Sequence, residues 1–169
     1  MTSMLLRSAL AALLLTCCLL PSPARADDKT FSGVSCRPYG TDTTADDLVY
    51  VINGVTTRAA THETVICDIP VDTETVWRGT ATGTLAIVFR GGGTASTVNC
   101  TALVGSGLMW GWNAYGSGSV SLPANTMVTA ALGSMTAPDA YAWAPVSVVC
   151  SLPPNATLIR IVLHETGAT

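Results

Sequence analysis

Short runs of β-branched and aromatic residues, separated by Gly, Pro, Asn and Ser, recur along most of this 169-residue chain. Runs of this kind are typical of β-strands, and no segment shows the apolar periodicity of an amphipathic helix. We therefore predict an all-β fold, an antiparallel β-sandwich of jelly-roll type with about nine strands and two disulfides. The strands are expected at residues 34–37, 47–52, 64–69, 84–90, 96–104, 108–115, 126–132, 141–150 and 157–165.

Alternation within two of these runs predicts which side chains are buried. Leu85, Ile87 and Phe89 share one face of their run, and Ile159, Ile161 and Leu163 share one face of the last run. These apolar faces are expected to form the core. Arg90, Arg160 and His164 are then expected on the opposite, outer faces, where His164 is a surface residue rather than a metal ligand.

The first 26 residues have the pattern of an export signal. Arg7 precedes an apolar stretch from Ser8 to Leu20, and Ala24 and Ala26 are small residues at the cleavage positions. We expect cleavage before Asp27, leaving residues 27–169 as a single β-sandwich domain in the periplasm or outside the cell. The apolar stretch is too short to remain as a membrane span. Lipid attachment at Cys17 or Cys18 is the alternative.

Removal of the signal also decides the charge of the mature chain. Arg7 and Arg25 leave with it, which lowers the formal net charge from −3 to −5. An acidic chain of this kind is not expected to bind nucleic acid.

Four cysteines remain after the signal, namely Cys36, Cys67, Cys100 and Cys150, and an even number in an exported chain predicts two disulfides. Each has a valine two positions earlier, which predicts that all four thiols face the core beside a valine. Four cysteines allow three pairings. We favour Cys36 with Cys67 and Cys100 with Cys150, because sequential pairing closes the shorter loops. The spacing does not fit a zinc site.

Two glycine-containing segments are expected to form turns between strands. Asn53-Gly54 matches a two-residue hairpin turn that needs positive φ. Gly91-Gly92-Gly93 is also expected to be a hairpin turn, since a phosphate-binding glycine loop would have to open a helix and a predicted strand follows here.

The segments Val65–Pro70 and Val148–Pro153 share the pattern V-x-C-x-[IL]-P, in which each proline is expected to mark a strand end. With the early Cys36 and the last strand pair, this pattern resembles a family of small exported bacterial proteins of uncharacterised function. The resemblance covers nearly all of the mature chain. It implies export and a jelly-roll-like sandwich, and it transfers no catalytic residues. We predict no cofactor.

Two clusters of titratable residues are candidate sites of weak specificity. His62 and Glu63, with Asp68, Asp72 and Glu74 downstream, could supply paired carboxylates for glycoside cleavage, although a solvated strand end and loop is the simpler interpretation. Asp42, Asp46 and Asp47 offer three carboxylates to calcium without the spacing of an EF-hand, so an unliganded acidic loop is the default. No nucleophile motif is present, and we predict no metal and no catalytic residues.

Aromatic residues carry the remaining hypothesis. Trp110 and Trp112 share a face with apolar neighbours and are expected in the core. In an unbroken strand over 141–150, Tyr141 and Trp143 point outward as a ligand platform, unless a bulge at Pro145 reverses them. We therefore predict a non-catalytic binding or structural module, whose candidate partner is a glycan or a cell-surface protein. The alternatives are a glycan-binding module using these exposed aromatics and a small secreted hydrolase.

Overall fold

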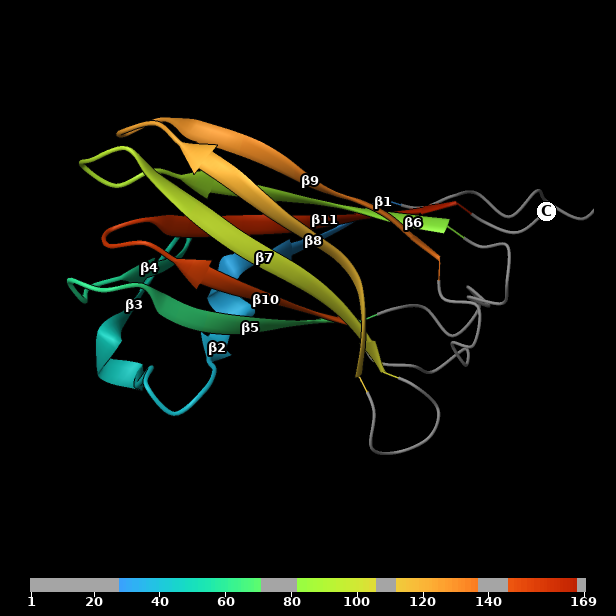
Figure 1. The fold of residues 1–169 in the computed structure, drawn as a ribbon, viewed down its shortest axis with the longest axis horizontal. Coiled ribbons are helices and arrows are strands. Elements are labelled where there is room, and N and C mark those ends of the chain that lie inside the picture. Colours follow the sequence, from blue (N-terminus) through green and yellow to red (C-terminus); the bar gives the residue numbers. More distant parts are fainter. Residues whose placement is uncertain (1–27, 71–81, 106–111, 137–145, 167–169) are drawn as a thin grey trace, which may run out of the picture.

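Two antiparallel β-sheets lie face to face in the computed structural model, which describes residues 28–70, 82–105, 112–136 and 146–166 (Figure 1). The predicted all-β sandwich is therefore confirmed. The two short 3-10 helices are η1 (Gly33–Ser35) and η2 (Ala45–Asp47). Within the described ranges, no helix is long and apolar enough to cross a membrane.

Six strands form one sheet and five form the other. The six-stranded sheet has the order β3-β4-β11-β6-β9, with β1 also paired to β11. It contains β1 (Asp28–Ser32), β3 (Leu48–Val51), β4 (Gly54–Thr57), β6 (Thr82–Arg90), β9 (Met127–Thr136) and β11 (Thr157–Thr166). The five-stranded sheet has the order β2-β5-β10-β7-β8. It contains β2 (Arg37–Pro38), β5 (Glu63–Ile69), β7 (Ser96–Gly105), β8 (Trp112–Leu122) and β10 (Val146–Leu152).

The inner faces of the two sheets form one apolar core. Leu85, Ile87 and Phe89 of β6 are fully buried, as their alternation predicts. They belong to the same cluster as Leu122 of β8 and Leu152 of β10. The core therefore lies between the two sheets.

Because β11 contains a β-bulge, the prediction that Ile159 faces the core is wrong. Leu158 pairs with Phe89 and Arg160 with Val88, so Ile159 is an extra residue without a partner on β6. The inward set is therefore Leu158, Ile161 and Leu163, all almost completely buried. Ile159 is half-buried and belongs to the outer side, together with Arg160. His164 also lies at the surface, as expected.

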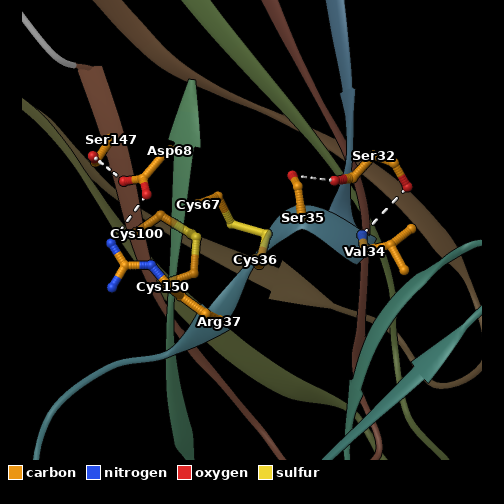
Figure 2. The surroundings of a disulfide bond; sticks show 10 residues. All are labelled: Ser32, Val34, Ser35, Cys36, Arg37, Cys67, Asp68, Cys100, Ser147 and Cys150. Atoms are coloured by element: carbon orange, nitrogen blue, oxygen red, sulfur yellow. Dashed lines mark hydrogen bonds and ion pairs between the residues drawn. A yellow bond between two sulfur atoms is a disulfide. The ribbon is translucent and has the colours of Figure 1, made fainter. Parts of the chain in front are cut away.

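Both predicted disulfides form, Cys36 with Cys67 and Cys100 with Cys150 (Figure 2). All four cysteines are buried. Cys100 and Cys150 are direct register partners on β7 and β10. Cys36 directly precedes β2, which pairs with β5. Each disulfide thus links neighbouring strands of the five-stranded sheet rather than joining the two sheets.

The predicted burial of the valine two positions before each cysteine is confirmed for three of the four cysteines. Val65, Val98 and Val148 are fully buried beside their cysteines. Val34 is 41% exposed, because it lies in η1 and not in a strand, so the two-residue alternation does not apply to it. The strand predicted over 34–37 is correspondingly reduced to β2. The strands β1 and β4 were not predicted.

The turn predictions were partly wrong. Residues 52 and 53 form the turn of the β3-β4 hairpin, whereas Gly54 already pairs with Val51 and carries the positive φ of 150°. Gly91-Gly92-Gly93 is not a hairpin turn, because β6 and β7 belong to different sheets. This segment crosses from one sheet to the other and passes close to the connections that follow β8 and β10. Prolines 70 and 153 do follow strand ends, as predicted.

A polar network lies on the outer face of the five-stranded sheet, on the far side of β5 from Cys67 (Figure 2). Asp68 accepts hydrogen bonds from the Ser147 hydroxyl at 2.8 Å and from the Arg37 guanidinium at 3.0 Å. Partial burial raises the pKa of Asp68, but the hydrogen bonds from Ser147 and Arg37 and the Arg37 charge outweigh it and leave the pKa lowered. The network therefore ties β2, β5 and β10 together through an ionised carboxylate.

We predict that Gly91→Ala destabilises the fold and Gly93→Ala does not. A Cβ at Gly91 would lie 2.2 Å from the carbonyl oxygen of Pro123, whereas a Cβ at Gly93 would meet nothing within 4 Å. The cost at Gly91 should be about 1–3 kcal/mol, as for other overpacked sites. Thermal or denaturant unfolding measures both variants, and equal stabilities would contradict the crossover geometry.

We predict that Asp68→Asn lowers the melting temperature at neutral pH by an amount that disappears in acid. Since the folded-state pKa is lowered, the stabilisation is fully present above the unfolded-state value near 3.8 and is lost as pH falls through the folded-state pKa. Both charged partners are about 60% exposed, so the effect should be at most about 1 kcal/mol. Thermal unfolding at pH 7, 5 and 2 measures it, with Asp46→Asn as the control. A difference that persists at pH 2 would contradict this role.

Candidate functional site

Tyr141 and Trp143, the predicted ligand platform, lie outside the described residues. Trp110 and the side chain of Trp112, both expected in the core, also lie outside them. The outward orientation of Tyr141 and Trp143 therefore stays a prediction.

The acidic segment from Asp42 to Asp47 has a local structural role. The Asp47 carboxylate accepts hydrogen bonds from the Thr44 hydroxyl at 2.6 Å and from the Thr44 backbone N–H at 2.8 Å. These bonds cap the N-terminal end of η2. These two hydrogen bonds lower the pKa of Asp47, the side-chain bond more strongly. In the part of the chain that the structure describes, no three His, Cys, Asp or Glu side chains are arranged to hold a metal ion.

The cluster around His62 and Glu63 does not come together as a carboxylate pair. Glu63 is 5% exposed and accepts a hydrogen bond from the Thr61 hydroxyl at 2.9 Å. Asp68 points to the opposite, outer side of β5, where it binds Arg37. Because Glu63 and Asp68 face opposite sides of one strand, they cannot flank a shared substrate. Asp72 and Glu74 lie outside the described residues.

A hollow of about 610 Å³ opens on the outer side of the six-stranded sheet, around the bulge of β11. Its volume is within the range of about 300–1,000 Å³ that is usual for ligand sites. Five strands and one turn supply its walls. The lining residues are Thr30 and Ser32 of β1, Val51 and Asn53 of the β3-β4 hairpin, Arg90 of β6, Met127 of β9, and Thr157, Ile159 and Arg160 of β11.

The bulge is the reason why β11 can contribute neighbouring residues to this hollow. In regular strand geometry, Ile159 and Arg160 would point to opposite faces. The bulge removes that alternation locally, and both side chains line the hollow. Gly33 and Gly54 allow the flanking chain to pack closely here, since a Cβ on either would lie 2.1 or 2.0 Å from the Leu158 carbonyl oxygen.

The hollow combines hydrogen-bonding groups with apolar surface. The Ser32 hydroxyl accepts a hydrogen bond from the Val34 N–H at 3.3 Å, which leaves its own proton available to a ligand. The Thr157 hydroxyl shares a hydrogen bond of 2.8 Å with Thr56. Met127 is 61% exposed and offers an apolar side chain at the rim. The nine lining residues include no carboxylate, histidine or cysteine, and their hydroxyl, amide and guanidinium groups can form hydrogen bonds with a ligand.

A smaller hollow of about 230 Å³ lies over β7 and β8 on the five-stranded sheet. It is lined by Asn99, Cys100, Thr101, Ser117, Gly118 and Ser119. The Ser119 hydroxyl donates a hydrogen bond to the Asn99 side-chain carbonyl, which uses two of its polar groups internally. This surface is smaller and its wall is more polar, so it is the weaker candidate for a ligand site.

Arg90 and Arg160 lie on outer faces, as the alternation predicts, but no sequence pattern predicts that they line one hollow. The contribution of Thr30 and Ser32 was missed because β1 was not predicted. The β-forming residues Thr30 and Phe31, shortly after the predicted export signal, are the available indication of that strand. The half-buried Ile159 was assigned to the core, since nothing in an apolar residue signals a bulge.

Comparisons with known proteins show a likeness in fold. No family model matches the chain, and no curated protein matches it. Among solved structures, the chain is similar to a xylan-binding module CBM15, with 14% identity, a TM-score of 0.55, and coverage of 86% of this chain and 100% of that chain.

Two further similar structures are larger proteins. The Podospora anserina GH26-CBM35 β-(1,4)-mannanase is 14% identical with a TM-score of 0.52, over 86% of this chain and 29% of that chain. The Clostridium thermocellum xylanase CBM22-1-GH10 modules complexed with xylohexaose are 13% identical with a TM-score of 0.54, over 86% and 29%. The chain thus spans under a third of the length of these two proteins. At such identities the likeness shows a shared β-sandwich fold.

Proposed function

We propose that this chain is an exported, non-catalytic carbohydrate-binding module whose ligand lies in the hollow around the β11 bulge. The observation that carries the proposal is the wall of that hollow. Hydroxyl, amide and guanidinium groups line it together with the apolar side chains of Val51, Met127 and Ile159. A sugar ring presents hydroxyl groups at its edge and C–H groups on its faces, so this mixture is complementary to it.

Two further observations support the proposal. Solved structures whose names describe carbohydrate-binding modules share the fold over most of this chain. Export is supported by the signal pattern of residues 1–26 and by two disulfides, which persist in oxidising compartments. Neither the lining of the hollow nor the cluster around Glu63 favours the hydrolase alternative.

We predict that Thr30→Phe blocks glycan binding and Thr97→Phe does not. Both threonines are exposed on outer faces, Thr30 on the six-stranded sheet and Thr97 on the five-stranded sheet. Only the first lines the hollow, so only there does the larger ring occupy the ligand's space. A glycan-array screen of the oxidised exported chain identifies the ligand. Titration of both variants should then show a loss of about tenfold or more for Thr30→Phe.

Two results would contradict the proposal. Loss of binding in Thr97→Phe with full binding in Thr30→Phe would place the ligand on the five-stranded sheet. Absence of binding to every glycan on the array would reject a carbohydrate-binding role altogether. Thermal unfolding of both variants serves as the control, because exposed substitutions should change stability by about 0.5 kcal/mol or less.

A further inference from the structure

Two arginines face the same hollow from adjacent strands. Arg90 ends β6 and pairs with Thr157, whereas Arg160 pairs with Val88 directly after the bulge. Arg90 and Val88 share the outer face of β6, so the two guanidinium groups approach the hollow from diagonal positions. Both side chains are exposed and both line its wall.

Neither arginine is balanced by a carboxylate among the described residues. Two acidic side chains on outer faces are paired with other residues: Asp28 binds His164 at 2.6 Å, and Asp68 binds Arg37 at 3.0 Å. The nine lining residues contain no Asp or Glu. In a chain with a negative formal charge, the hollow is therefore a local concentration of unbalanced positive charge.

We propose that the hollow selects an acidic sugar, whose carboxylate or sulfate group is held by Arg90 and Arg160. This inference rests on the proposed carbohydrate-binding function and specifies its ligand class. A guanidinium group presents a planar fork of N–H donors that matches the paired oxygens of a carboxylate or sulfate. Two such forks at one site favour an anionic group over the uncharged hydroxyl or ester at the same position of a neutral sugar.

Ser32 supports the same ligand from the opposite side of β11. It pairs with Arg160 in the register of β1 and β11, and both residues line the hollow. The hydroxyl is oriented by the Val34 N–H, and the Ser35 hydroxyl donates to the Ser32 carbonyl oxygen at 2.8 Å (Figure 2). Ser32 is thus a pre-oriented donor to the anionic group or to a neighbouring sugar hydroxyl.

The overall negative charge of the chain limits which acidic glycans fit. Long-range attraction to a densely charged polymer is opposed by the formal charge of the chain. Short-range contacts to one acidic group inside the hollow are much less affected, because charges beyond about 8 Å are largely screened at physiological salt. The inferred ligand is therefore a short acidic oligosaccharide or a chain with spaced acidic groups.

The test compares one oligosaccharide with and without its charge. The oxidised exported chain is titrated by calorimetry with tetragalacturonate, with its methyl ester, and with a sulfated carrageenan tetrasaccharide. We expect the acid to bind about tenfold or more tightly than the ester. Arg160→Gln and Arg90→Gln should each remove that preference, whereas Arg58→Gln, an exposed arginine outside the hollow, should keep it. Tighter binding of the carrageenan tetrasaccharide would identify sulfate as the acidic group.

Different results would overturn the acidic ligand and the proposed carbohydrate-binding function. Equal affinity for acid and ester, unchanged in both arginine variants, would overturn the acidic ligand. Carbohydrate binding would survive that result if neutral glycans still bind and Thr30→Phe still blocks them. Absence of binding to all acidic oligosaccharides would also overturn the inference. Thermal unfolding of the arginine variants confirms that a lost preference does not come from a lost fold.

Discussion

The bulge at Ile159 is the feature on which the rest of the outer surface depends. It separates two pairings along the same edge of β11, since β4 pairs with residues 157 and 158 and β1 with residues 160–164. The Leu158 carbonyl is packed against Gly33 and Gly54, where any side chain would clash. One local irregularity thus brings β1, the β3-β4 hairpin and Arg160 around a single hollow.

Both disulfides link strands of the opposite, five-stranded sheet. The chain passes from the six-stranded sheet to the five-stranded sheet through η1, and Cys36 fixes that passage to β5. Ser32 lies just before η1 and lines the hollow. The Cys36–Cys67 disulfide of the five-stranded sheet therefore restrains the segment that brings Ser32 to the outer face of the six-stranded sheet. Cys100–Cys150 stabilises the centre of that sheet, where β7 and β10 meet.

Much of the fold could be predicted from local patterns. The alternation of Leu85, Ile87 and Phe89 identified a core strand, and four inward cysteines with the shorter loops gave the correct pairing. Features set by tertiary contacts could not be predicted. An apolar residue such as Ile159 can lie on either face of a strand, so its identity does not indicate a bulge. Gly91 is required by the nearby Pro123 carbonyl rather than by its own turn. The hollow was missed because it joins five segments far apart in the sequence.

Backbone amide chemical shifts report whether the ligand occupies the hollow around the bulge. In an NMR titration of the oxidised chain with an acidic oligosaccharide, we expect shift changes at Ser32, Asn53, Arg90, Ile159 and Arg160. Changes confined to Asn99, Thr101, Ser117 and Ser119, on the five-stranded sheet, would contradict it. Changes confined to the segment of Tyr141 and Trp143 would contradict it as well.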